Sequence, residues 1–119
     1  MGLVREQDLF MGDLARLVEW VRSRGLVVTG GELWRTKDQQ QIYFRVGKSR
    51  TMASRHCDRL AVDLNIFKVR PEDGLPVLTY EKADLQEVGD YWESLDEKNS
   101  WGGNWAGFLD TSHFERRRM

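Results

Sequence analysis

Apolar residues recur at helical spacing in three parts of the chain. Residues 9–21 carry them at every third or fourth position, which predicts an amphipathic helix of about four turns that ends before Gly25. Residues 36–39 fit a capping box and predict a second helix that runs toward residues 46–47. Residues 85–95 repeat the helical periodicity and predict a third helix.

Other stretches have the patterns of β-strands. Residues 26–29 form an apolar run that two glycines end, which predicts a short buried strand. Residues 60–67 alternate, so this strand should turn an apolar face to the core and carry Asp63 on its opposite face. Residues 71–76 are typical of a hairpin tip, from which the chain would return through residues 77–80.

Two loops and a last strand complete the expected elements. Residues 47–53 are polar and predict a loop. Residues 101–105 predict another, because their glycines permit backbone angles that other residues avoid. Residues 112–115 predict a short strand. Helices and hairpin strands without βαβ order indicate the α+β class, and a length of 119 residues indicates one domain over residues 1–119.

Composition and charge narrow the classes of partner. The formal net charge of −1 argues against a general nucleic-acid binder, which normally carries a basic excess. Apolar runs are shorter than a membrane span, and charges interrupt residues 3–10, so we expect no membrane partner and no signal peptide. We expect a monomer that is made in the cytoplasm. The three arginines at 116–118 are interpreted as a solvated tail rather than a contact for a polyanion.

The two histidines of the chain both stand near an aspartate. His56 precedes Asp63 by seven positions, and His113 follows Asp110 by three. Two neutral imidazoles and one carboxylate (His56, Asp63 and His113) make a three-ligand zinc set that leaves a position for water, as catalytic zinc sites do. Asp110 is close enough in sequence to His113 to act as a base beside the metal. The pattern predicts a metal-dependent hydrolase.

Each of these residues also has a plainer interpretation. A carboxylate in an apolar strand, such as Asp63, is costly to bury without a cation or hydrogen-bond donors, but on an edge strand it would face water. A lone histidine is more often a surface or core residue. The metal site is favoured because both histidines of the chain stand at such a spacing from an aspartate, one as His-x6-Asp and the other as Asp-x2-His. Cys57 is the single cysteine, which excludes an internal disulfide. It is interpreted as an inert thiol, because on an extended backbone its side chain would point away from the site that His56 faces.

The motifs of the chain resemble those of a known peptidase family. They are Ser54-x-His56-x4-Ala61-x-Asp63, then Trp101-Gly102-Gly103, then Asp110-x2-His113-Phe114-Glu115, preceded by Gly31-Glu32-x2-Arg35-Thr36-x2-Gln39. This set resembles the zinc peptidases of the D-alanyl-D-alanine carboxypeptidase and L-alanyl-D-glutamate peptidase family, and in particular single-domain phage endolysins. The resemblance covers about residues 31–115. It implies the hedgehog-type fold, a small antiparallel sheet that carries the zinc site and packs against about three helices.

The resemblance also implies roles for individual residues. One zinc ion per chain would be held by His56, Asp63 and His113. Asp110 would be the general base that takes a proton from the water on zinc and delivers it to the leaving amine.

Further roles implied by the resemblance concern the substrate. Arg35 would polarise the scissile carbonyl or hold a substrate carboxylate, and Ser54 and Gln39 would assist in substrate binding. Arg35 is alternatively a surface charge opposite Glu32, and the capping box already explains Gln39. Two tryptophans at 101 and 105 are expected to pack in the core rather than wall the cleft.

Three positions depart from the family pattern. Arg59 stands where the family mostly has glycine, which puts the turn before the strand in doubt, because glycine there often permits a positive φ. Asn104 replaces an aspartate and Ser112 a proline. None of the three is a predicted ligand or the predicted base.

The function implied by the resemblance is hydrolysis of the stem peptide of peptidoglycan at the L-alanyl-D-glutamate bond, on the cell wall after release from the cytoplasm. One alternative is a D-Ala-D-Ala carboxypeptidase or dipeptidase of wall remodelling. An alternative from another class is a zinc-stabilised binding module without catalysis. Asp110 argues against that module, because a purely structural site has no use for a base.

Overall fold

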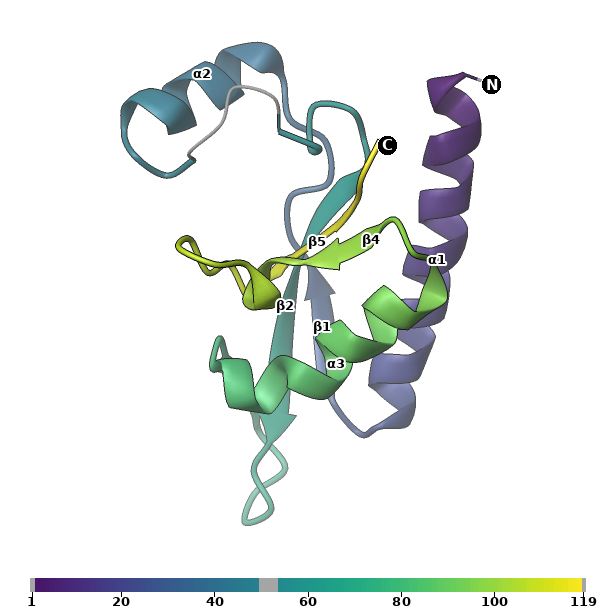
Figure 1. Cartoon of the computed structure of the whole chain (residues 1–119). Coiled ribbons are helices and arrows are strands. Elements are labelled where there is room, and N and C mark those ends of the chain that lie inside the picture. Colours follow the sequence, from purple (N-terminus) through teal and green to yellow (C-terminus); the bar gives the residue numbers. More distant parts are fainter. Residues whose placement is uncertain (1, 50–53, 119) are drawn as a thin grey trace.

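The computed structural model describes residues 2–49 and 54–118, so residues 50–53 of the predicted loop lie outside it (Figure 1). The chain forms α1 (Leu3–Ser23), β1 (Val27–Gly30), α2 (Lys37–Arg45), β2 (Ala61–Val69), β3 (Pro76–Thr79), α3 (Lys82–Leu95), β4 (Asn99–Trp101), the 3₁₀ turn η1 (Gly102–Asn104) and β5 (His113–Arg116). Over these described ranges, helices and antiparallel strands without parallel crossovers confirm the α+β class. Within the described ranges, no helix combines the length and apolar character that spanning a bilayer requires.

The sheet is organised around β2. Its strand order is β1-β2-β5-β4, and all pairs are antiparallel. The first half of β2 pairs with β5 from Ala61 to Asp63, and the second half pairs with β3 from Ile66 to Val69. β1 pairs with residues 64–67, so it lies along the other edge of β2. The predicted hairpin from β2 into β3 is confirmed.

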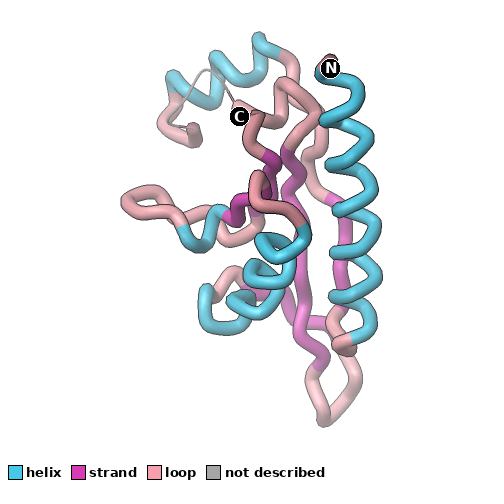
Figure 2. Tube along the Cα trace, turned by 45° about the vertical axis from the view of Figure 1, so that its right-hand side comes forward, coloured by secondary structure: helices cyan, strands magenta, loops and turns pink. Residues whose placement is uncertain are grey.

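One face of the sheet forms the hydrophobic core with α1 and α3. Figure 2 shows α1 running alongside the strands, and in Figure 1 α2 lies at the upper left, on the opposite side of the view from α1. Val62, Leu64 and Ile66 of β2 are buried, as the alternation predicts. Trp92 of α3 packs edge-on against Phe10 of α1 and Phe114 of β5. The opposite face of β2 is thereby left for Asp63.

Several elements differ from the sequence prediction. α1 begins at Leu3 and is longer than the predicted four turns, because the residues before the apolar repeat continue the same helix. The prediction that β1 is buried is wrong: it is an edge strand, and Val27 is 38% exposed. The loop predicted for residues 101–105 is wrong at its start, because Trp101 ends β4 and is fully buried.

The glycines after β4 are needed for space rather than for unusual backbone angles. Neither Gly102 nor Gly103 has a positive φ. A Cβ on Gly102 would lie 2.1 Å from the carbonyl oxygen of Asp110, and one on Gly103 would lie 2.2 Å from the ring of Trp101. The Asp110 loop therefore packs directly on the backbone of η1.

Arg59 keeps the turn that the family pattern assigns to glycine. Its φ is 58°, the left-handed conformation that normally costs a non-glycine residue energy. The guanidinium lies 4.8 Å from the ring centre of Trp34, a cation–π contact that offsets part of the cost. The substitution therefore leaves the turn before β2 intact.

The interpretation of residues 116–118 as a solvated tail is wrong for Arg116. This residue ends β5 and is only 3% exposed. Its guanidinium lies 3.3 Å from Glu6 of α1 and 2.9 Å from Asp96. Lys98 also contacts Glu6, at 2.9 Å. Burial of a cation requires such partners, and the network ties the last strand to α1.

The close packing at Gly102 yields a first prediction. Gly102→Ala should lower the free energy of unfolding by about 1–3 kcal/mol, because the new methyl group has no space and the Asp110 loop must shift. Gly30→Ala is the matched control, since a Cβ there meets nothing within 4 Å. Urea unfolding of both variants measures the difference. Equal stability of the two variants would contradict the steric account.

Candidate metal centre and cleft

His56, Asp63 and His113 come together on the face of the sheet away from the core. Their ligand atoms all lie within 4.8 Å of one another. Nε2 of His56 is 3.4 Å from Oδ1 of Asp63, and Nδ1 of His113 is 3.6 Å from the same oxygen. The group is largely buried. The structure thus brings together the three residues that the sequence predicts as ligands.

Strand pairing and one turn account for this convergence. Asp63 and His113 are direct cross-strand partners of β2 and β5. Residues at facing positions of an antiparallel pair point to the same side. The turn before β2 brings in His56 and is closed by a hydrogen bond from the N–H of Leu60 to the carbonyl of Arg55, 2.9 Å.

A glycine lets the segment before α2 pass close to Asp63. The N–H of Gly31 donates to the carbonyl of Asp63, at 2.8 Å. A Cβ on Gly31 would lie 2.8 Å from that same oxygen. The N–H of Asp63 in turn donates to the carbonyl of Glu32, at 2.9 Å. These contacts hold the backbone of Asp63 from the side opposite β5.

The donor set fits a divalent cation. Nε2 of His56 and Oδ1 of Asp63 are buried, and neither has a hydrogen-bond partner among the described residues. Native proteins rarely leave buried polar atoms unpaired. At 3.4 Å these two atoms face each other without hydrogen-bond geometry. Two imidazole nitrogens and one carboxylate oxygen around one point are the ligand types that zinc takes in open sites.

Charge coupling within the group shifts two pKa values. Burial raises the pKa of Asp63, but the neighbouring imidazoles of His113 and His56 outweigh it and hold that pKa well below its usual range. Burial lowers the pKa of His113, but Asp63 and Glu115 outweigh it and raise this pKa to about 9. In the absence of metal, the group is therefore a carboxylate beside an imidazolium at neutral pH. A cation would take the place of that proton.

Asp110 is held beside the metal group by its own loop. Its N–H donates to the carbonyl of Gly102 (3.0 Å), and its carbonyl accepts from the N–H of His113 (3.1 Å). The hydroxyl of Ser112 donates to Oδ1 of Asp110, at 3.1 Å. Ser112, a departure from the family pattern, therefore helps to orient the predicted base. Asn104, the other departure in this region, bonds Glu93 and Gln86 on the surface of α3.

Arg35 is embedded at the edge of the cleft, so its interpretation as a surface charge is wrong. Its side chain is 10% exposed and donates from Nε to Glu32, at 2.6 Å. It also donates to Gln40 (2.5 Å) and to the hydroxyl of Ser54 (3.3 Å). Ser54 is itself buried and accepts from the N–H of His56, at 3.2 Å. Arg35 is thus linked to a metal-group residue through Ser54.

The glutamine that contacts Arg35 is Gln40, the neighbour of Gln39, whose predicted role in substrate binding stays a prediction. The N–H of Gln39 donates to the hydroxyl of Thr36, at 3.0 Å, which confirms Thr36 as the cap of α2. Gln40 is fully buried and bonds both Arg35 and Ser49. The family resemblance pointed to Gln39, whereas burial of one polar residue in a short helix is what identifies Gln40.

Cys57 is outside the metal group, although not for the predicted reason. Residues 55–59 form a turn, not an extended backbone. The thiol lies 3.9 Å from the carbonyl of Thr36, and burial raises its pKa. It is a half-buried thiol that faces the start of α2.

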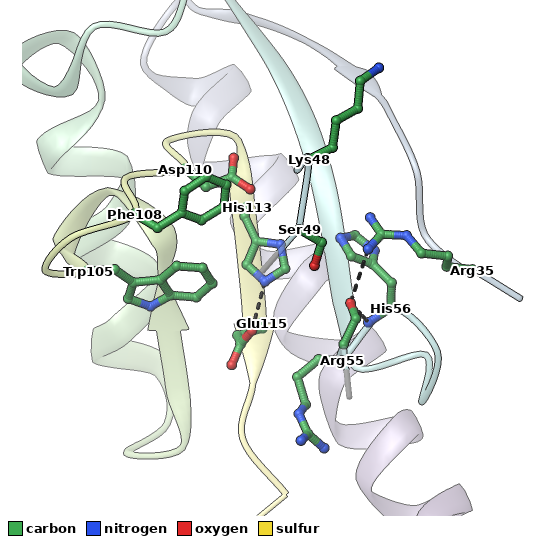
Figure 3. Close-up of a pocket in the computed structure, with 11 residues that line it drawn as sticks. Arg35, Lys48, Ser49, Arg55, His56, Trp105, Phe108, Asp110, His113 and Glu115 are labelled. Carbon is green, nitrogen blue, oxygen red and sulfur yellow. Dashed lines mark hydrogen bonds and ion pairs between the residues drawn. The ribbon is translucent and has the colours of Figure 1, made fainter. Parts of the chain in front are cut away.

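A cleft surrounds the metal group. Its main cavity, about 390 Å³, has an apolar wall of Trp105 and Phe108 and includes the cations Arg35, Lys48 and Arg55. In Figure 3, the apolar wall and Asp110 lie on one side of His113, and Arg35 and His56 lie on the other. The ring of Trp105 packs 4.9 Å from that of His113. Trp105 therefore walls the cleft, whereas Trp101 packs in the core as predicted.

A second cavity, about 230 Å³, adjoins the same group. It is lined by Glu32, Arg35, Tyr43, Lys48, Asp63 and Asp110. Arg35, Lys48 and Asp110 line both cavities. The two spaces therefore adjoin each other beside the metal group. Sequence reasoning missed Lys48, Arg55 and Glu115 as lining residues. Only the position of Glu115, two residues after His113 on a strand, gave a signal.

Comparison with known proteins finds related peptidases. A family model described as D-alanyl-D-alanine carboxypeptidase matches residues 47–116. The L-alanyl-D-glutamate peptidase of Listeria phage A118 is 32% identical over 100 residues, which are 84% of this chain and 34% of that protein. The chain thus spans about a third of the length of this relative. The crystal structure of the L-Ala D-Glu endopeptidase ChiX of Serratia marcescens superposes with a TM-score of 0.66 at 23% identity, covering 97% of this chain and 88% of that one.

The coupled charges predict a pH dependence of the metal-free protein. The folded pKa of His113 lies near 9 against about 6.5 unfolded, so its stabilisation is complete below 6.5 and is lost as the pH rises through 9. Urea unfolding midpoints of the metal-free protein should therefore fall across this window. His113→Gln should remove this decline. A stability that rises with pH in the unaltered chain would contradict the assignment.

Proposed function

This chain belongs to the D-alanyl-D-alanine carboxypeptidase family, and on that premise we propose that it is a zinc-dependent peptidoglycan peptidase. The bond that we assign to it is the one between L-alanine and D-glutamate in the stem peptide of the bacterial cell wall. The observation that carries the proposal is the buried group of His56, Asp63 and His113, in a cleft that Asp110 also lines. Two of its potential ligand atoms have no hydrogen-bond partner among the described residues. Zinc is proposed because its open sites use these ligand types.

The chemistry follows from the side chains around this group. When bound, a zinc ion supplies Lewis acidity and lowers the pKa of a water ligand toward about 7. Asp110 accepts the proton of the attacking water and delivers it to the leaving amine. Arg35 donates hydrogen bonds to the scissile carbonyl or to a substrate carboxylate. Ser54, within hydrogen-bond distance of Arg35, assists in holding the peptide.

Three features favour an internal peptide bond over a terminal one. Two adjoining cavities reach the metal group, which suits a peptide that extends beyond a terminal residue. Lys48 and Arg55 line the main cavity and suit a substrate that carries the carboxylates of D-glutamate. The relatives from Listeria phage A118 and Serratia marcescens carry the same bond in their names. The D-Ala-D-Ala carboxypeptidase activity is the second candidate, because it gives the matching family its description.

Digestion of purified peptidoglycan tests the bond. We expect new amino ends on D-glutamate and new carboxyl ends on L-alanine, with the glycan strands intact, and mass spectrometry of the released fragments identifies both ends. Release of free D-alanine alone would favour the carboxypeptidase. New reducing sugar ends would refute the peptidase proposal altogether.

Asp110→Asn separates a catalyst from a zinc-stabilised binding module. An asparagine keeps the size of the side chain and still hydrogen-bonds water, but it cannot accept the proton. The variant should stay folded, keep about one zinc ion per chain and lose about 10²–10⁴-fold in the rate of wall hydrolysis. Metal analysis and a turbidity assay on cell walls measure the two properties. An unchanged rate would remove Asp110 from the mechanism, and loss of zinc would make it a ligand instead.

A further inference from the structure

The two histidines of the metal group turn different ring nitrogens toward Asp63. His56 approaches Oδ1 of Asp63 with Nε2, whereas His113 approaches the same oxygen with Nδ1. A neutral imidazole carries its proton on one nitrogen and offers a lone pair from the other. Each ring can therefore bind a cation at the common point only if its proton sits on the far nitrogen.

Each far nitrogen has an acceptor, but the two acceptors differ in charge. Nδ1 of His56 donates to the backbone carbonyl of Leu33, at 3.3 Å. Nε2 of His113 donates to Oε1 of Glu115, at 2.8 Å, a contact drawn as a dashed line in Figure 3. A hydrogen bond to a carboxylate is shorter and stronger than one to a neutral carbonyl. It also raises the basicity of the nitrogen on the other side of the ring.

We propose that Glu115 is a positioning residue that holds His113 in the tautomer and ring orientation that present Nδ1 to a cation. The inference rests on the proposed function of the site. A half-turn of the ring about χ2 would put Cδ2 in the place of Nδ1 and Cε1 in the place of Nε2. The bond to Glu115 opposes both this half-turn and the transfer of the proton to Nδ1.

The sheet fixes Glu115 for this role. His113 and Glu115 are two residues apart on β5, so their side chains lie on the same face. Glu115 pairs with Ala61 on one side and Ser100 on the other. Its backbone carbonyl accepts a hydrogen bond from Nε1 of Trp92, at 3.0 Å. Ala61 and Ser100 are small and leave space for the side chain of Glu115. The paired backbone of Glu115 cannot rotate freely.

The side chain of Glu115 is only partly accessible, and its partner ring is enclosed. Glu115 is 16% exposed, so its hydrogen bond competes little with water. The ring of His113 has Trp105 at 4.9 Å and His56 at 4.9 Å, measured between ring centres. These contacts restrict where the ring lies, but they do not distinguish one nitrogen from the other. Glu115 makes that distinction.

Zinc affinity of the full chain provides the first test. Glu115→Ala should bind zinc about 10–100-fold more weakly, the usual effect of losing such a partner of a ligand histidine. Glu115→Gln should fall between this variant and the unaltered chain, because it keeps an acceptor oxygen without the charge. Asp58→Asn is the control: it removes a carboxylate that pairs with Arg55 at the cleft, 2.7 Å away, and should leave the affinity unchanged. Competition with a chromophoric chelator measures all four proteins.

The tautomer of His113 provides a readout that does not depend on activity. In the ¹⁵N-labelled metal-free protein at a pH well above 9, where the imidazole of His113 is neutral, the unaltered chain should show the proton on Nε2. Glu115→Ala should show a mixture of tautomers while its near-ultraviolet circular dichroism shows a native core. Unchanged tautomer and unchanged zinc affinity in both Glu115 variants would overturn the role of Glu115. Failure of the unaltered chain to bind zinc would instead overturn the proposed metal centre.

Discussion

The facing pair of Asp63 and His113 on β2 and β5 is the constraint on which the site depends. Side chains alternate along a strand, so a slip of β2 by one residue would turn Asp63 toward the core and separate it from His113. The register is secured on the other face by Val62 and Phe114, which are also direct partners and are buried. The hydrophobic core and the metal group are thus two faces of the same strand pairing.

Much of the fold followed from periodicity, because the decisive segments are strongly patterned. The alternation of residues 60–67 located the core face of β2 and the outward Asp63, and both features are present. The cap at Thr36 and the third helix are also confirmed. The edge position of β1 and the strand β4 were not predicted, since the burial of a short segment depends on its neighbours rather than on its own residues.

The same distinction, between what a local pattern records and what depends on neighbours, applies to the candidate site. The three candidate ligands were identified because a chain with two histidines and paired aspartates offers few alternatives. Gln40 and Glu115 were missed because their importance lies in what they touch, and no local pattern records the contact of one with Arg35 or of the other with His113. Trp101 and Trp105 illustrate the limit most clearly. They are four residues apart in one motif, yet one packs in the core and the other walls the cleft.

The ligand group also has a consequence for the entropy of the chain. Asp63 and His113 are separated by 50 positions, and the single cysteine leaves no internal disulfide to bridge them. A cation held by both would close that long loop as a reversible cross-link. For a covalent link across a loop of this length, the loss of disorder in the unfolded chain amounts to about 4 kcal/mol. The same ion that is proposed to act on the substrate would then also stabilise the fold as a cross-link, and its removal would lower the stability of the whole molecule.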